Sequence, residues 1–205
     1  MLYYQTIEPA TLDLLKSIQP LESLSGARLV GGTALALQIG HRKSVDLDFF
    51  GKILLSSEEL RDLLSESHEL KVVQEGRNIN IYKLDQVKVD FVNYRYEWIT
   101  GPVVEDGIVL ADTRDIAAMK VNAIIGRGTK KDFIDLYFLL RIYPLSQIID
   151  FYFQKYPDGN PFIALKSLSY FGDAESDPMP PMLIDVSWDE MKRTIRQHLV
   201  SLQNE

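Results

Sequence analysis

The chain has 205 residues, about 1.4 times a typical 150-residue domain, so one domain or two closely joined lobes is expected. Hydrophobic residues make up 46% and charged residues 25%, which excludes a disordered or low-complexity chain. The absence of cysteine excludes thiol nucleophiles, iron–sulfur clusters and cysteine-bound zinc. The formal net charge of −7 argues against a dedicated DNA-coating protein.

Targeting signals are not evident either. No apolar run approaches the roughly 18 residues of a membrane span, and the first 15 residues lack the basic start and apolar core of a secretion signal. We therefore expect a soluble, cytoplasmic protein.

The first 110 residues predict a mixed α and β lobe. Residues 28–30 form a short apolar run that ends at Gly31-Gly32, and helix-forming residues follow, which is typical of strand, tight turn and helix. Residues 44–50 alternate and predict a half-buried strand, with Val45, Leu47 and Phe49 on one face and Asp46 and Asp48 on the other.

The rest of this lobe predicts one helix and a meander. Ser56 and Glu59 have the spacing of a capping box, which predicts a helix from there to about residue 66. Three β-rich runs follow, separated at Gly76 and at Asp85-Gln86, and they predict an antiparallel meander over residues 69–74, 78–84 and 87–94.

After residue 110 the pattern becomes helical. A proline-rich loop over residues 177–182 precedes a capped final helix that begins near Ser187 and ends near 202. The other predicted helices cover residues 113–125, 130–142, 145–156 and 160–171. The fold class is thus α/β (α+β), with an α/β lobe over residues 1–110 and a helical lobe over residues 111–205.

The Gly31-Gly32 turn and the Asp46/Asp48 pair form the first candidate site. A strand that leads into two glycines and a helix leaves backbone N–H groups unpaired, and a phosphate can approach them closely. Asp46 and Asp48 project from the same face of a strand, where they could share a divalent cation. A glycine turn beside a solvent-exposed acidic strand is the simpler alternative for either half alone. Arg42 lies between the two halves and could contact a phosphate or balance Asp46.

Asp90 is a candidate third carboxylate. In the run 87–92, Val87, Val89 and Phe91 point one way and Lys88 and Asp90 the other. If this strand pairs beside residues 44–50, Asp90 completes a cluster with Asp46 and Asp48; otherwise it is a surface aspartate.

Lys120 lies on a helix that is apolar almost all round, on one stripe with Ile116 and Ile124. A lysine there extends to water or meets an anion, and a nucleotide phosphate is one such anion.

The run from Arg127 to Asp135 combines bases and acids. Thr129 and Asp132 have capping-box spacing, which explains Asp132 but leaves Asp135 partly unexplained. Arg127, Lys130 and Lys131 form the tightest basic cluster, so they are candidates for nucleic-acid phosphate contacts; an ordinary solvated turn explains them equally well.

Taken together, these motifs resemble the AbiEii-type nucleotidyltransferase toxin family of the polymerase-beta-like nucleotidyltransferase superfamily. The resemblance covers roughly residues 25–142 and rests on GGTALAL, GHRKSVDLDFF, VDF and MKVNAIIGRGTKKDFIDLYFLL. It implies a nucleotidyltransferase that uses an NTP and Mg²⁺ or Mn²⁺. Family members are typically toxins with a cognate antitoxin, and several are thought to add nucleotides to the 3′ end of tRNA.

The resemblance also implies roles for single residues. Asp46, Asp48, Lys120 and Asp132 would be catalytic, with Asp46, Asp48 and Asp90 as metal ligands and Lys120 on the nucleotide phosphates. The residues implied in nucleotide binding are Gly31, Gly32, Thr33, Ser44, Arg42 and Asp135. The superfamily's usual Gly-Ser is Gly-Gly here, which removes one hydroxyl contact to phosphate.

Other functions remain open at this point. The same site could transfer a nucleoside monophosphate to a protein hydroxyl, which the acidic net charge favours, or a non-catalytic module could bind nucleotide or a partner without turnover. We expect the cleft between the two lobes to contain Gly31, Gly32, Asp46, Asp48, Lys120 and Asp132.

Overall fold

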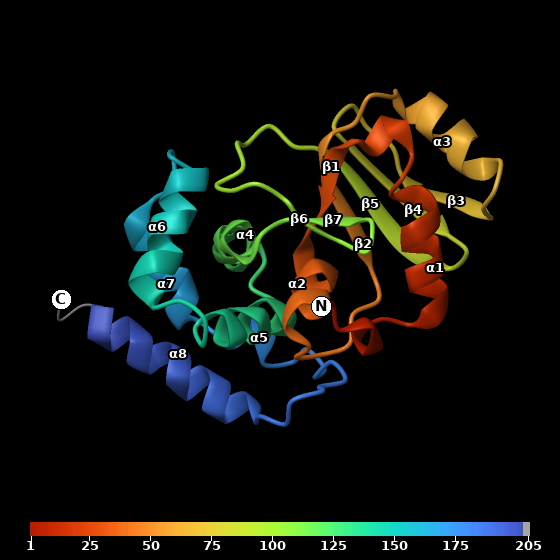
Figure 1. The fold of residues 1–205 in the computed structure, drawn as a ribbon. Coiled ribbons are helices and arrows are strands. Elements are labelled where there is room, and N and C mark those ends of the chain that lie inside the picture. The colour runs from red at the N-terminus through yellow and green to blue at the C-terminus, as the bar shows by residue number, and fades with distance from the viewer. Residues whose placement is uncertain (203–205) are drawn as a thin grey trace. The chain divides into compact units, whose positions relative to one another are not determined.

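A computed structural model describes residues 1–202 of the chain (Figure 1). The described residues form two compact units. The first, called the α/β unit, contains Met1–Arg95 and Pro102–Ala111; the second, called the helical unit, contains Tyr96–Gly101 and the chain from Asp112 onward. No helix among residues 1–202 is both long enough and apolar enough to cross a membrane.

The α/β unit is built around one mixed seven-stranded sheet, whose strands lie in the order β3-β4-β5-β2-β1-β7-β6. Strand β2 pairs with β5 in parallel and β1 with β7 in parallel, while the other neighbours are antiparallel. The strands are β1 (Gly26–Leu29), β2 (Leu47–Lys52), β3 (Leu70–Gln74), β4 (Ile79–Leu84), β5 (Val87–Asn93), β6 (Val103–Glu105) and β7 (Ile108–Leu110). This arrangement confirms the predicted α/β class and the meander.

Helices accompany this sheet and supply its core contacts. Strand residues Leu47, Phe49, Val89 and Phe91 are fully buried, and the rings of Phe49 and Phe91 stack at 5.6 Å between centroids. The helices are α1 (Pro9–Ile18), α2 (Gly31–Ile39) and α3 (Ser57–Ser65), with short 3₁₀ turns η1 (Tyr4–Thr6) and η2 (Glu22–Leu24). The predicted capping box of α3 is present.

Four features of this unit differ from the prediction or were not predicted. Strand β2 begins at Leu47 instead of Ser44, and Val45 is 55% exposed, so its predicted place on the buried face is wrong. Residues 44–46 are not part of the strand. The Thr33 hydroxyl donates a hydrogen bond to the carbonyl oxygen of Asp46, which is therefore not used in pairing with a neighbouring strand. Helix α1 and the β6–β7 hairpin were not predicted, although Pro at a first helical position and the Asp106-Gly107 turn are recognised signals for them.

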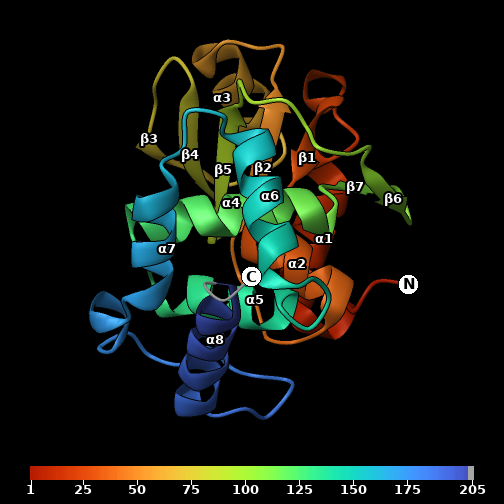
Figure 2. The same ribbon diagram turned by 90° about the vertical axis from the view of Figure 1, so that its left-hand side faces the viewer.

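The helical unit is centred on α4 (Thr113–Gly126), which packs against α5 (Lys130–Leu139), α6 (Leu145–Lys155) and α7 (Pro161–Ser169) (Figure 2). A 3₁₀ turn, η3 (Gly172–Ala174), and a loop lead to α8 (Trp188–Leu202). Every residue of α5 except Lys131 is buried, so this helix lies inside the unit and not on its surface. The predicted helices are thus confirmed, with α5 ending three residues earlier than expected.

Candidate active site

The acidic cluster is built on two neighbouring parallel strands. In the register of β2 and β5, Leu47 lies opposite Val89, and Asp48 lies opposite Asp90. Because side chains alternate along a strand, the buried Leu47 and Val89 fix Asp48 and Asp90 on the other face. The sheet thus provides the pairing on which the prediction for Asp90 depended.

Asp46 and Lys88 extend the cluster by one position. Asp46 directly precedes β2, and continuation of the register brings it level with Lys88 on the same face. Lys88 Nζ lies 2.7 Å from Asp90 Oδ1. Burial lowers the pKa of Lys88, but the contact with Asp90 and the charges of Asp48 and Asp46 outweigh it, so the pKa is raised above its usual value.

The two glycines make room for charged side chains of the protein itself. Gly31 has φ +69°, and a Cβ atom there would collide with Oδ2 of Asp48. A Cβ at Gly32 would collide with Nη2 of Arg42. The glycine pair therefore lets the start of α2 lie directly against Asp48 and Arg42.

The start of α2 is polar and has no side-chain cap. Thr33 hydrogen-bonds to Ser44 Oγ at 2.8 Å and donates to the carbonyl of Asp46, which ties the turn to the acidic segment. Arg42 is buried and donates from Nη1 to the carbonyl of Lys43 at 3.0 Å. Backbone N–H groups at an uncapped helix start, next to a guanidinium, favour an anionic ligand.

The donor chemistry of this cluster fits Mg²⁺. Asp46, Asp48 and Asp90 supply carboxylate oxygens, which this cation prefers, and Asp90 Oδ1 is buried without a hydrogen bond that meets the usual angular limits. Residues 1–202 contain no group of three or more His, Asp or Glu already arranged to hold a metal ion. Mg²⁺ is commonly bound by one or two carboxylates together with substrate phosphates, so fewer than three protein ligands suffice.

In the helical unit, Lys120 is buried and its charge is balanced by the protein. Lys120 Nζ lies 2.6 Å from Asp135 Oδ2 and 3.1 Å from Asp132 Oδ1. The sequence left open whether this lysine reaches water or an anion; two aspartates on the next helix are the anions in this structure. This also accounts for Asp135, which capping could not explain.

Asp132 is the centre of that network. Its carboxylate accepts bonds from Arg127 Nε at 3.0 Å and from Thr129 Oγ1 at 2.7 Å in addition to the Lys120 contact. Burial raises the pKa of Asp132, but Lys120, Arg127 and Thr129 together lower it to about 2. The predicted capping box does not form, because the Thr129 hydroxyl binds this carboxylate instead of a backbone N–H.

The structure corrects the prediction made for the basic cluster. Lys130 is buried, with Nζ bonded to the carbonyls of Glu175 and Asp177, so its predicted contact with nucleic-acid phosphates is wrong. The carboxylate of Asp177 in turn accepts from the Lys130 N–H at 2.9 Å and caps α5 from a distant loop. Arg127 keeps a 66% exposed side chain although it pairs with Asp132, and Lys131 is exposed.

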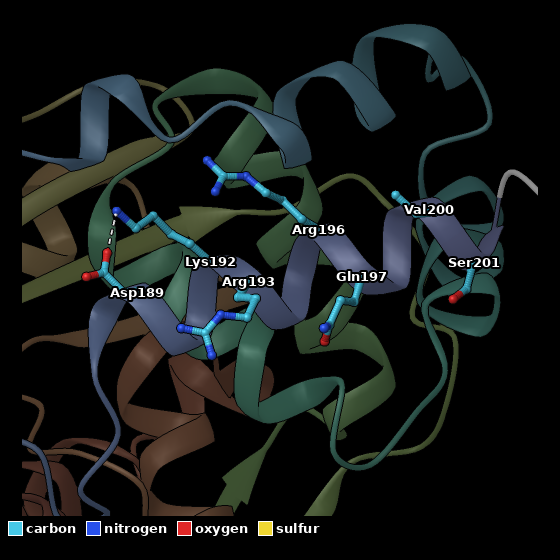
Figure 3. A pocket seen from close by; sticks show the side chains of 7 residues that line it. All are labelled: Asp189, Lys192, Arg193, Arg196, Gln197, Val200 and Ser201. Atoms are coloured by element: carbon cyan, nitrogen blue, oxygen red, sulfur yellow. Dashed lines mark ion pairs between the residues drawn. The ribbon is translucent and has the colours of Figure 1, made fainter.

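Two further charged features of the structure were not predicted from the sequence. Asp115 and Lys155 form a fully buried pair at 2.7 Å. On helix α8, Arg193, Arg196, Gln197 and Ser201 share an exposed face (Figure 3), and the guanidinium of Arg196 lies 5.0 Å from the centre of the Phe171 ring. Their spacing of three and four residues was the signal that could have revealed this face.

A family model described as "Nucleotidyl transferase AbiEii toxin, Type IV TA system" matches residues 13–203. The chain belongs to this family. The resemblance drawn from the motifs is therefore confirmed, and the protein is a nucleotidyltransferase toxin of a type IV toxin–antitoxin system. Membership implies an NTP substrate and an antitoxin partner.

Other proteins resemble this chain in sequence or in fold. An uncharacterized protein of Aquifex aeolicus (strain VF5) is 34% identical over 181 residues, covering 83% of this chain and 87% of that protein. MenT4, a nucleotidyltransferase toxin of Mycobacterium tuberculosis H37Rv, has a TM-score of 0.64 at 15% identity, with 96% of this chain and 82% of that one covered. A crystal structure of a putative nucleotidyltransferase from H. pylori has a TM-score of 0.56 at 20% identity, with 96% and 98% covered. At these identities the two structures show the shared fold.

Proposed function

We propose that this AbiEii family protein transfers a nucleoside monophosphate from an NTP to the 3′ end of tRNA in a metal-dependent reaction, in the cytoplasm where both substrates occur. The observation that carries the proposal is the alignment of Asp48 with Asp90 on β2 and β5, next to Asp46 and the uncapped start of α2. Carboxylates beside a helix N-terminus suit a cation bound to a triphosphate.

The residues of the α/β unit then have separate roles. Asp46, Asp48 and Asp90 would hold Mg²⁺, which when bound neutralises charge that develops on the phosphates. The N–H groups of Gly31 and Gly32 and the guanidinium of Arg42 orient the triphosphate, and Thr33 and Ser44 keep the Asp46 segment against the turn. The acceptor hydroxyl loses its proton to solvent and forms a new P–O bond to the α-phosphorus. The bond from the α-phosphorus to the oxygen that bridges to the β-phosphate breaks, and pyrophosphate leaves with that oxygen.

Lys120 and Asp132 are assigned to the same reaction as part of the proposal. We propose that residues of the helical lobe, 111–205, also take part in the reaction, with Lys120 acting on the phosphates and Asp132 and Asp135 holding its ammonium group in place. Their buried network of contacts supports a positioning role, because a lysine held by two carboxylates has little freedom to move.

The exposed face of α8 supports RNA as the acceptor. Arg193 and Arg196 extend from this face, together with the hydrogen-bonding side chains of Gln197 and Ser201 (Figure 3). Arginine pairs well with phosphate, and such contacts fix a nucleic-acid backbone in position. Lys192 contributes less, since it pairs with Glu175 at 2.7 Å and Asp189 at 3.0 Å.

The decisive experiment incubates the protein and each labelled NTP with total RNA and, separately, with total protein. We expect label at the 3′ end of tRNA and a requirement for Mg²⁺ or Mn²⁺. Label in protein would instead favour the second candidate, transfer to a protein hydroxyl, which the net charge of −7 keeps open. A fully folded protein that labels neither would contradict the proposed activity.

The role of α8 has its own test. Replacing both Arg193 and Arg196 with Gln should raise the KM for tRNA by roughly tenfold, with little change in the KM for NTP, because two phosphate contacts are lost. Arg141→Gln is the matched control, since Arg141 is also exposed and lies 5.8 Å from an aromatic ring, that of Phe138. An equal effect of the control on the KM for tRNA would contradict a specific role for α8.

A further inference from the structure

Lys88 is a cation placed among the three carboxylates of the candidate site. It lies two residues before Asp90 on β5, so both side chains leave the same face of the sheet, with Lys88 Nζ 2.7 Å from Asp90 Oδ1. Asp48 lies directly opposite Asp90 on β2. Like charges directly opposite one another on neighbouring strands destabilise a sheet unless a cation lies between them.

We propose that Lys88 is the built-in counter-ion of this cluster: without metal its ammonium group neutralises the carboxylates, and an arriving divalent cation must displace it to gain Asp90. This inference rests on the proposed function, since it takes Asp46, Asp48 and Asp90 as the metal-binding residues. It adds a residue that competes with the metal and thereby sets the affinity of the site.

The surroundings of Lys88 suit such an exchange. The Lys88 side chain is 44% exposed, so its ammonium group can move into solvent, whereas the Asp90 side chain is 18% exposed and the oxygen that Lys88 contacts is buried. Exposed ion pairs stabilise proteins only weakly, and the lysine stem is flexible enough for the ammonium group to leave. Lys83 lies directly opposite Lys88 on the neighbouring strand β4, and its like charge favours the position of Lys88 toward Asp90.

The same arrangement explains why the aspartates are not already arranged as a metal site. Within residues 1–202 no three carboxylate or histidine side chains are grouped as ligands, and one oxygen of Asp90 faces Lys88 instead. A metal ion that arrives with a triphosphate brings phosphate oxygens, which offer the displaced ammonium group a new partner. The counter-ion thus favours the metal–nucleotide complex over the metal alone.

The test measures binding of Mn²⁺ alone to the full chain, by the electron paramagnetic resonance signal of unbound Mn²⁺. Lys88→Met should lower the Kd for Mn²⁺ by about fivefold, the factor that corresponds to the upper range for an exposed ion pair. Lys83→Met is the matched control, because it removes a lysine from the same face one strand away, and its Kd should stay within about twofold of wild type. Without metal, Lys88→Met should also melt at a lower temperature than wild type, and Mn²⁺ should bring the melting temperature of the variant back toward that of wild type.

The possible results are distinguishable. An unchanged or higher Kd in Lys88→Met, or an equal decrease in Lys83→Met, overturns the counter-ion role. If wild type binds Mn²⁺ and labels an acceptor while Lys88→Met has an unchanged Kd, the proposed function stands and this inference alone fails. If wild type binds no Mn²⁺ in the presence or absence of NTP, the metal-dependent function fails as well.

Discussion

Asp46 is the residue whose replacement most cleanly separates charge from structure. Its side chain is partly exposed, and the bond that holds its segment uses its backbone carbonyl, so Asp46→Asn should leave the fold intact. Because the variant also relieves repulsion with Asp48, we expect an unchanged or slightly higher melting temperature without metal. Nucleotide transfer should fall by at least about 100-fold, the scale for losing one electrostatic contributor to a transition state.

Thermal unfolding and transfer assays on the same preparations check this prediction. Asp62→Asn, which removes an exposed aspartate from α3, should keep wild-type transfer and serves as the control. Loss of activity together with unfolding would show that Asp46 is structural, and full activity in a folded variant would refute its role in catalysis.

The lowered pKa of Asp132 predicts a specific loss of stability in acid. A carboxyl group whose pKa is about 2 in the folded protein and near 3.8 in the unfolded chain stabilises the fold fully above about pH 5 and loses that contribution as the pH falls through 2. The contribution is about 2 kcal/mol at neutral pH. The free energy of unfolding, measured with urea between pH 6 and 2, should fall with pH in wild type and fall less steeply in Asp132→Asn. Identical slopes in the two proteins would contradict the prediction.

At the scale of elements, the Gly31 turn joins the end of β1 to the start of α2 under two constraints. Gly31→Ala must accept both a positive φ and a collision with the Asp48 carboxylate. Gly107→Ala, in the β6–β7 turn, has a similar φ of +77° but no atom within 4 Å of the new Cβ, so it measures the φ cost alone, about 1 kcal/mol. We expect Gly31→Ala to destabilise the protein more than Gly107→Ala and to reduce nucleotide transfer, which Gly107→Ala leaves intact.

Denaturant unfolding of Gly31→Ala and Gly107→Ala measures the difference between their free energies of unfolding directly. Equal losses of stability would mean that Asp48 moves aside at no cost, and the close packing of the α2 start against the aspartate would then have no energetic importance.

At the scale of the whole molecule, the buried pair of Asp115 and Lys155 holds a distant segment of the chain, Tyr96–Gly101, within the helical unit. The chain enters the helical unit at Tyr96 and leaves it after Gly101. Within this segment Asp115 accepts from the N–H of Ile99 at 2.9 Å, and Lys155 donates to the carbonyl of Glu97 at 3.0 Å. Breaking a buried ion pair leaves a charge uncompensated, which typically costs 3–5 kcal/mol, so Lys155→Met should destabilise the helical unit by roughly that amount.

Hydrogen exchange locates that loss along the chain. The amides of Ile99 and Thr100, which are bonded to Asp115, should exchange faster in Lys155→Met than in wild type. Lys166→Met, which removes an exposed lysine from α7, should leave both amides protected. Unchanged protection in Lys155→Met would show that the segment is held by other contacts.

Elements whose signals are local could be predicted from the residues alone. Alternation fixed the faces of β5, the Ser56–Glu59 spacing fixed the start of α3, and the glycine pair fixed the turn before α2. The order of these motifs also indicated the family, and the family model that matches residues 13–203 confirms it. Local backbone preferences and short-range hydrogen bonds depend only on neighbouring residues, so they can be read from the chain.

Which distant charges meet depends on how the elements pack together. Lys120 pairs with Asp132 and Asp135, whereas the sequence left open whether it reaches water or an anion such as a nucleotide phosphate. Lys130 is bonded to the loop at Asp177, whereas the sequence allowed a solvated turn or a nucleic-acid phosphate contact equally. Alternation along the strand predicted that Lys88 and Asp90 share a face. The position of Lys88 beside Asp48, however, depends on β2 lying next to β5. Such pairings depend on which elements pack together and on the burial that makes an unpaired charge costly, and no local pattern in the chain encodes either.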